Sequence, residues 1–142
     1  MTRLLCLLCA LASPAGAGHE LDGRDIGRGA ALYLDYCADC HGADLEGAPD
    51  WQTPGPDGLL PAPPHDASGH TWHHDNALLF DYTFHGGAAA LAARGVTDFN
   101  SGMPGFGEIV GEAGVWDILA YIRSTWPPEV QAMQASRNPP HD

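Results

Sequence analysis

Cys37-Ala38-Asp39-Cys40-His41 places two thiols and one imidazole within a short segment of the chain. On an α-helix, residues at positions i, i+3 and i+4 project from the same side, so the two thiols and the imidazole face one way. A thiol can form a covalent bond to carbon, and an imidazole nitrogen is a common metal ligand. The spacing therefore predicts a group that is tethered by Cys37 and Cys40 and whose metal ion is bound by His41.

Cys-x-x-Cys-His is the attachment motif of c-type haem. The two thiols can add to the two vinyl groups of the haem, which leaves the imidazole beneath the iron as an axial ligand. Covalent attachment suits a small domain because it prevents loss of the cofactor and places a large apolar disc in the core. We therefore expect one covalently attached haem c per chain, bound through Cys37, Cys40 and His41.

Three other interpretations of the cysteine pair are weaker. A thioredoxin-like site requires a strand before its helix, and no strand alternation precedes Cys37. A zinc site that combines both cysteines with His70 and with His73 or His74 has a longer Cys-to-His gap than zinc fingers use. A disulfide across two residues cannot staple a fold, so a cofactor explains the pair better.

Residues 1–17 have the organisation of a Sec-type signal peptide. Arg3 supplies a positive charge, an apolar run covers residues 4–12, and Ala15-Gly16-Ala17 is a small-x-small cleavage site. The apolar run is far shorter than the roughly 20 residues that span a membrane. We therefore predict export to the periplasm, cleavage after Ala17, no membrane span in the mature chain and a flexible lead-in over residues 18–24. The alternative is an uncleaved interfacial anchor.

The charge balance limits the classes of partner. The 142 residues, enough for one small domain with a leader, include 18 acidic and 6 basic residues, and the net charge is −12. All the basic residues are Arg, and the chain contains no Lys. Nucleic acids and anionic membranes require clustered cations, so neither is an expected partner. Electrostatic attraction instead favours a protein partner with a basic docking patch.

Apolar periodicity predicts an all-α domain over residues 25–128, followed by a C-terminal tail over residues 129–142. Long segments rich in Pro and Gly join the helices, and the tail can extend helically for a turn or two. We expect three to four helices: one from Asp25 toward Cys37, one over Asp75–His85, a short turn over Ala88–Arg94 and one over Gly111–Trp126. Three to four helices give only a thin core unless a large ligand fills the interior. We therefore expect the loops to wrap around the haem.

Met103, in the segment Gly102-Met103-Pro104-Gly105-Phe106, is the best candidate for the second axial ligand of the iron. The following Pro biases Met103 toward an extended backbone, and the flanking glycines let the chain approach a flat cofactor. Met103 lies 62 residues after His41, which is enough chain to reach the opposite face of a haem. A thioether favours ferrous iron, so His/Met ligation raises the reduction potential.

With these motifs the chain resembles the class I cytochromes c, which are small electron carriers with one haem. The resemblance covers about Ile26 to Trp126 and also includes the final amphipathic helix. It implies that Gly29 and Tyr33 cross that helix near Ile118 and Tyr121. The absence of Lys departs from family members that dock through a ring of lysines.

The resemblance also implies two further roles for residues around the haem. A proline carbonyl orients the proximal His in this family, and Pro49, Pro61 and Pro63 are the candidates here. The candidates for packing against the haem are Tyr33, Pro61, Pro63, Trp72 and Phe106.

Four histidines follow the proline-rich segment within ten residues, at His65, His70, His73 and His74. One interpretation is a second metal site, for copper, because imidazole suits that ion. The other is a hydrogen-bonded loop that precedes the next helix and packs Trp72 against the haem edge. A histidine from this group is also an alternative to Met103 as the sixth ligand.

The sequence therefore predicts a periplasmic one-electron carrier rather than an enzyme, because His41 and Met103 fill both axial positions. Redox proteins are the expected partners, with a quinol-oxidising complex or a dehydrogenase as donor and an oxidase or reductase as acceptor. Two alternatives stay open. The chain is also compatible with a haem subunit of a larger oxidoreductase, or with a five-coordinate haem protein that binds a gas or peroxide.

Overall fold

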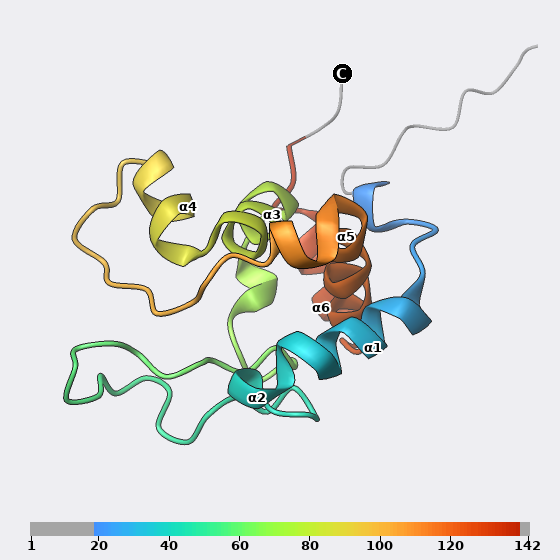
Figure 1. Ribbon diagram of the computed structural model, residues 1–142. Helices are drawn as coiled ribbons and strands as arrows, with labels where there is room; N and C mark the ends of the chain where they lie inside the picture. The colour runs from blue at the N-terminus through green and yellow to red at the C-terminus, as the bar shows by residue number, and fades with distance from the viewer. Residues whose placement is uncertain (1–18, 140–142) are drawn as a thin grey trace, which may run out of the picture.

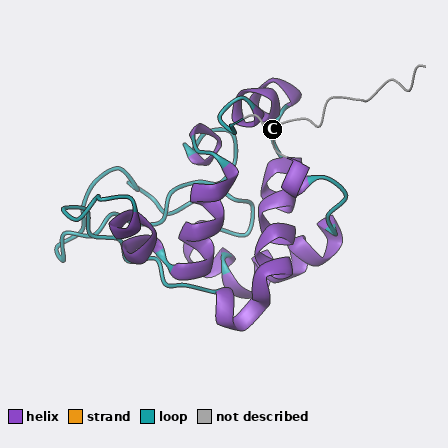
Figure 2. Ribbon diagram, turned by 90° about the horizontal axis from the view of Figure 1, so that it is seen from above, coloured by secondary structure: helices purple, strands orange, loops and turns teal. Residues whose placement is uncertain are grey.

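The computed structural model describes residues 19–139, and within this range the secondary structure is helical, with no β-strand (Figures 1 and 2). This confirms the predicted all-α class. The predicted signal peptide lies outside the described residues. In chain order the helices are η1 (His19–Leu21), α1 (Ile26–Tyr36), α2 (Ala38–His41), η2 (Thr71–His73), α3 (Asn76–His85), α4 (Gly87–Ala93), α5 (Gly107–Ser124) and α6 (Pro128–Ala135). None of the described helices is long and apolar enough to cross a membrane.

Helix α1 begins where the sequence supplies a cap. The side chain of Asp25 accepts a hydrogen bond from the Arg28 amide at 2.9 Å, which satisfies one of the free N–H groups of the first turn. The helix stops at Cys37, and α2 is a separate short helix that ends at Gly42, where φ is 82°. The attachment motif therefore straddles a break: Cys37 lies between the two helices, at the N-cap position of α2, and Cys40 and His41 lie inside α2.

Helices α1 and α5 cross at close range and form the centre of the core (Figure 1). A Cβ atom added at Gly29 would collide with the backbone carbonyl of Asp117 and lie 3.0 Å from Tyr121 Cβ. The rings of Tyr33 and Tyr121 pack with their centroids 5.6 Å apart. The expected crossing is thus confirmed, because only a residue without a side chain fits at position 29.

Helix α5 begins at Gly107, before the predicted start at Gly111, and ends at Ser124. Gly111 has φ 70° and ψ 170°, so it interrupts the helix instead of starting it. The predicted apolar stripe of Val115, Ile118, Leu119 and Ile122 is buried in the core. The four predicted helical regions are all present, α6 is the short helical extension that was expected of the tail, and α2 is an addition.

Both ends of the described chain pack onto the domain. Leu21 of η1 is buried in the core, although residues 18–24 were expected to form a flexible lead-in. Helix α6 lies within the expected tail, and its Gln134 donates a hydrogen bond to the Asn76 side chain at 2.7 Å. Asn138 accepts from the Asn76 amide at 2.7 Å, so the tail holds the start of α3.

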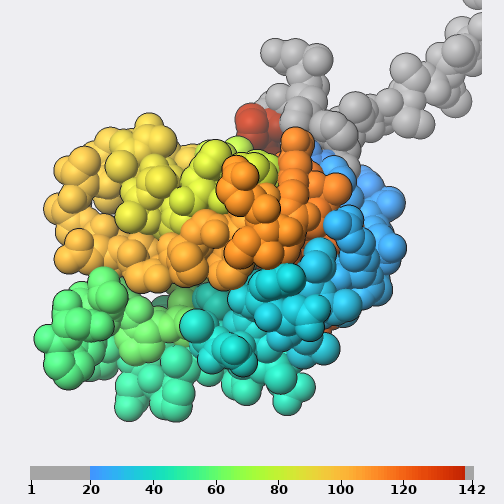
Figure 3. Space-filling view, in the orientation of Figure 1, coloured from blue at the N-terminus to red at the C-terminus, as the bar shows by residue number. Residues whose placement is uncertain are grey.

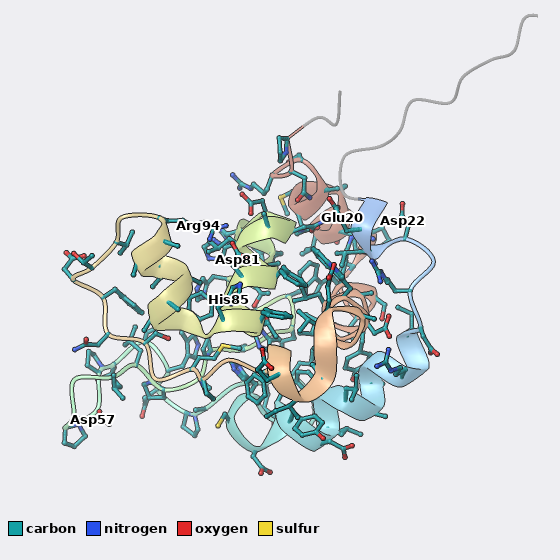
Figure 4. All side chains as sticks on the ribbon, turned by 45° about the horizontal axis from the view of Figure 1, so that its top comes forward. Glu20, Asp22, Asp57, Asp81, His85 and Arg94 are labelled. Carbon is teal, nitrogen blue, oxygen red and sulfur yellow. The ribbon has the colours of Figure 1, made fainter. Side chains whose placement is uncertain are left out.

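Helices α3 and α4 form the second side of the molecule. Asp75 caps α3 by accepting from the Leu78 amide at 2.7 Å, and Phe80 stacks on Trp116 of α5. Arg94, just after α4, pairs with Asp81 of α3 at 2.9 Å (Figure 4). The loop over residues 42–70 and the loop over residues 94–106 extend from the helical core on the same side of the molecule (Figure 1).

Candidate functional site

A cavity of about 950 Å³ lies between the proline-rich loop and α2 on one side and α3, α4 and the 94–106 loop on the other. Figure 3 shows the surface hollowed between these two parts of the chain. Its walls are mainly apolar, with contributions from Leu79, Phe106, Ile118 and Leu119. A large, concave and mainly apolar site of this kind is typical of small-molecule and cofactor binding.

The two cysteines of the motif line this cavity as free thiols. Cys37 is buried and Cys40 is exposed, so the pair extends from the interior to the mouth. Burial raises the pKa of the Cys37 thiol to about 11, and the neighbouring Cys40 adds to the shift. Cys37 is therefore a neutral thiol at physiological pH, available for covalent attachment and unlike the acidified cysteine of a redox-active motif.

His41 is buried on the cavity wall with a fixed ring orientation. Its Nδ1 lies 2.8 Å from the carbonyl oxygen of Pro63, which can only accept, so Nδ1–H donates. Burial lowers the pKa of His41, although the hydrogen bond to Pro63 opposes this. The ring is thus neutral with its Nε2 lone pair free, which is the form that binds a metal ion. Of the three prolines considered, Pro63 supplies the orienting carbonyl.

The ring of His65 stacks on the ring of His41, with centroids 4.0 Å apart and planes inclined by 22°. Its Nδ1 is 2.8 Å from the Thr71 hydroxyl, and its carbonyl accepts from Trp126 Nε1 at 2.7 Å. Burial, followed by the proximity of His41, lowers the pKa of His65 well below its ordinary value. A neutral aromatic ring therefore supports one face of the His41 imidazole.

Met103 lines the cavity on a loop that is held in place by hydrogen bonds. The Tyr82 hydroxyl donates to Ser101 Oγ at 2.8 Å, and the Met103 amide donates to the same oxygen at 3.3 Å. The Met103 carbonyl accepts from the Gly87 amide at 3.0 Å. The end of the loop is held by the Phe106 amide, which donates to the carbonyl of Thr83 at 2.9 Å.

These residues fit a covalently bound haem. The cavity has the required size and apolar walls, two thiols reach it, and an oriented imidazole and a thioether both border it. The family model described as Cytochrome c matches residues 26–126, which is more than half of the chain. The chain belongs to the cytochrome c family. Members are haem-based electron carriers with covalently bound haem c. No solved structure matched the chain.

Two adjacent glycines shape the methionine side of this cytochrome. Gly86 has φ 88°, and a Cβ atom there would lie 2.8 Å from the Gly105 nitrogen. A Cβ atom on Gly87 would collide with Ser101 Oγ and the Tyr82 ring. Gly86 and Gly87 follow directly after α3, which ends at His85. In the structure the pair also lets the Met103 loop lie directly against the backbone of the α3–α4 junction.

The predicted haem-packing residues divide into two groups. Pro61, Pro63 and Phe106 line the cavity of the cytochrome. Tyr33 does not line it, but supports it from behind, since its hydroxyl donates to the Gly42 carbonyl at 3.0 Å and thereby holds the end of α2. Trp72 also lies outside the cavity wall: its indole packs against the tilted His73 ring and donates to the Ala67 carbonyl.

The histidine-rich segment does not assemble a second metal centre. No group of three or more His, Cys, Asp or Glu side chains in the described part of the chain is arranged to hold a metal ion. The four histidines instead separate: His65 supports His41, His70 and His74 line the cavity, and His73 packs on Trp72.

Proposed function

We propose that this protein is an exported electron carrier with one haem, whose iron is bound by His41 and Met103. The observation that carries the proposal is the hydrogen bond from His41 Nδ1 to the Pro63 carbonyl at 2.8 Å. Both thiols and Met103 line the same cavity as this histidine. A histidine that is oriented in this way, next to two free thiols, suits covalent haem better than any other ligand.

The haem supplies the chemistry, because its iron accepts and releases one electron. The protein residues control that reaction through their positions. Because Nδ1 of His41 is hydrogen-bonded to Pro63, its Nε2 is the nitrogen available to the iron. The hydrogen-bonded loop would supply the Met103 sulfur as the second ligand. The apolar wall excludes water and raises the cost of charge on the iron, while a thioether ligand favours the ferrous state.

The partner surface is expected near the exposed Cys40. The exposed Asp39 and Asp57 border the same cavity, with Tyr36 and Leu60 as exposed apolar residues. Between Arg28 and Arg94 the chain has nine acidic residues and no Arg or Lys. This charge supports docking to a basic surface of a quinol-oxidising complex or dehydrogenase that donates electrons, and of an oxidase or reductase that accepts them.

The absorption spectrum of protein made with export and haem attachment tests the assignment. We expect the bands of haem c in the reduced form, and the weak far-red band of sulfur-ligated iron in the oxidised form. Met103→Ala should abolish the far-red band, lower the reduction potential by on the order of 100 mV and allow rapid binding of carbon monoxide. A colourless folded product would refute haem binding, and an unchanged band in Met103→Ala would refute the methionine ligand.

Two measurements test export and docking. The N-terminus of the exported protein should follow Ala17, and an intact leader would contradict cleavage. Electron exchange with a cationic redox protein should slow as salt rises, and Asp39→Asn/Asp57→Asn should weaken that salt dependence. Glu129→Gln, an exposed substitution on α6, is the matched control. A rate that is independent of salt would contradict electrostatic docking.

A further inference from the structure

One corner of the cavity wall is formed by two imidazoles and an indole. The rings of His70 and His74 have centroids 5.5 Å apart in an edge-to-face arrangement. Trp51 stacks on His70 at 5.4 Å with the planes inclined by 12°. All three residues line the cavity, and no other described residue hydrogen-bonds to either imidazole ring.

This corner is the part of the described cavity wall where imidazole nitrogens have no hydrogen-bond partner. The chain contains no Lys, and no Arg is among the described residues that line the cavity. Of the four lining histidines, His41 is held by Pro63 and His65 by Thr71, which leaves His70 and His74 with free ring nitrogens. A haem carries two carboxylates, and carboxylates that leave water require hydrogen-bond donors, preferably charged ones.

We propose that His70 and His74 bind the haem carboxylates and that the pair takes up a proton when the iron is reduced. This inference rests on the proposed function, since it assumes a haem in the cavity. It adds a proton-coupled role to the electron carrier. For each electron that a redox partner supplies to the iron, the imidazole pair accepts up to one proton from solvent, which balances the charge.

The groups around the pair determine the direction of the effect. Without a ligand, burial lowers the pKa of both rings; His73 adds to this at both, and His70 and Arg137 add to it at His74, where Asp75 opposes. Bound carboxylates act in the opposite direction: they raise the pKa of both rings toward neutral pH. Ferrous iron carries one positive charge less than ferric iron, so the proton is held more tightly in the reduced protein.

The imidazole pair therefore has one acid dissociation constant in the oxidised protein and a smaller one in the reduced protein, and the reduction potential falls as pH rises between the two corresponding pKa values. We expect the two constants to differ about tenfold, which corresponds to a total change of 59 mV in the potential for one electron. Spectroelectrochemical titration of the holoprotein between about pH 5 and pH 9 measures this change.

His70→Gln and His74→Gln keep a hydrogen-bond donor but cannot titrate, so each should reduce the pH dependence and the double variant should abolish it. His85→Gln is the matched control, because His85 is an exposed histidine on α3 that does not line the cavity (Figure 4). If the wild-type potential does not depend on pH although the haem c spectrum is normal, this inference is overturned and the proposed function stands. A pH dependence that survives in the double variant would overturn it as well, whereas a protein without haem would overturn the proposed function.

Discussion

Removal of one hydroxyl group, in Tyr82→Phe, should weaken the bond between Met103 and the iron. The Tyr82 hydroxyl donates to Ser101 Oγ at 2.8 Å, and the same oxygen accepts from the Met103 amide at 3.3 Å. The substitution keeps the ring, which packs beside Gly87, and removes only this hydrogen bond. The perturbation therefore acts on the position of the ligand loop and leaves the cavity wall in place.

The size of the effect follows from the number of bonds lost. A net contribution of about 1 kcal/mol for one partly buried hydrogen bond corresponds to about a fivefold change in an equilibrium constant. Ser101→Ala removes both bonds that converge on Ser101 Oγ, so its effect should be about 2 kcal/mol, or about thirtyfold. Because the two substitutions remove a shared interaction, the double variant should be no weaker than Ser101→Ala alone.

Displacement of Met103 by added imidazole measures this directly. Loss of the far-red band of the ferric protein reports the exchange, and the midpoint concentration should fall about fivefold in Tyr82→Phe and about thirtyfold in Ser101→Ala. Tyr121→Phe removes the same hydroxyl group from a ring that packs on Tyr33 and does not line the cavity, so it should leave the midpoint unchanged. Equal midpoints in the wild type, Tyr82→Phe and Ser101→Ala would refute the idea that this hydrogen-bonded loop holds the ligand.

Three other substitutions test the packing. Gly29→Ala should destabilise the holoprotein by about 3 kcal/mol, since the new methyl group collides with the α5 backbone, and an unchanged denaturant midpoint would contradict the tight crossing. Gln134→Ala should cost about 2 kcal/mol, because Asn76 loses a buried donor, and a thermal melt should show a fall of several degrees. Cys37→Ala/Cys40→Ala should prevent covalent attachment and reduce helical circular dichroism, because the large cavity then lacks a permanently bound occupant; full helicity without haem would argue against the ligand as part of the core.

The sequence was most informative where the chemistry is local. The motif of Cys37, Cys40 and His41 is defined by residue types and spacing, so its meaning does not depend on distant parts of the chain. Helix starts such as Asp25 and Asp75 were predictable for the same reason, because a capping side chain acts within its own turn.

Features that depend on contacts between distant segments were not predictable. Three prolines could have faced His41, and only the path of the loop shows that Pro63 does so, 22 residues along the chain. The role of His65 had no local signal, since a histidine in a polar loop does not reveal the ring it will stack on. The short helix in the tail was expected, but its sequence did not indicate that α6 packs against η2 and the start of α3.

The two long loops are held by hydrogen bonds at their bases, near the proposed iron ligands His41 and Met103. The proline-rich loop is closed at its base where the His65 amide donates to the Leu45 carbonyl, and it is joined to the helical core where Trp126 Nε1 donates to the His65 carbonyl. The methionine loop is joined where Phe106 meets Thr83 and where Ser101 meets Tyr82. Because both anchors lie beside a proposed iron ligand, we expect changes there to alter stability and reduction potential together. Substitutions at a loop tip such as Asp57, which points away from the helices in Figure 4, should leave both nearly unchanged and alter only docking.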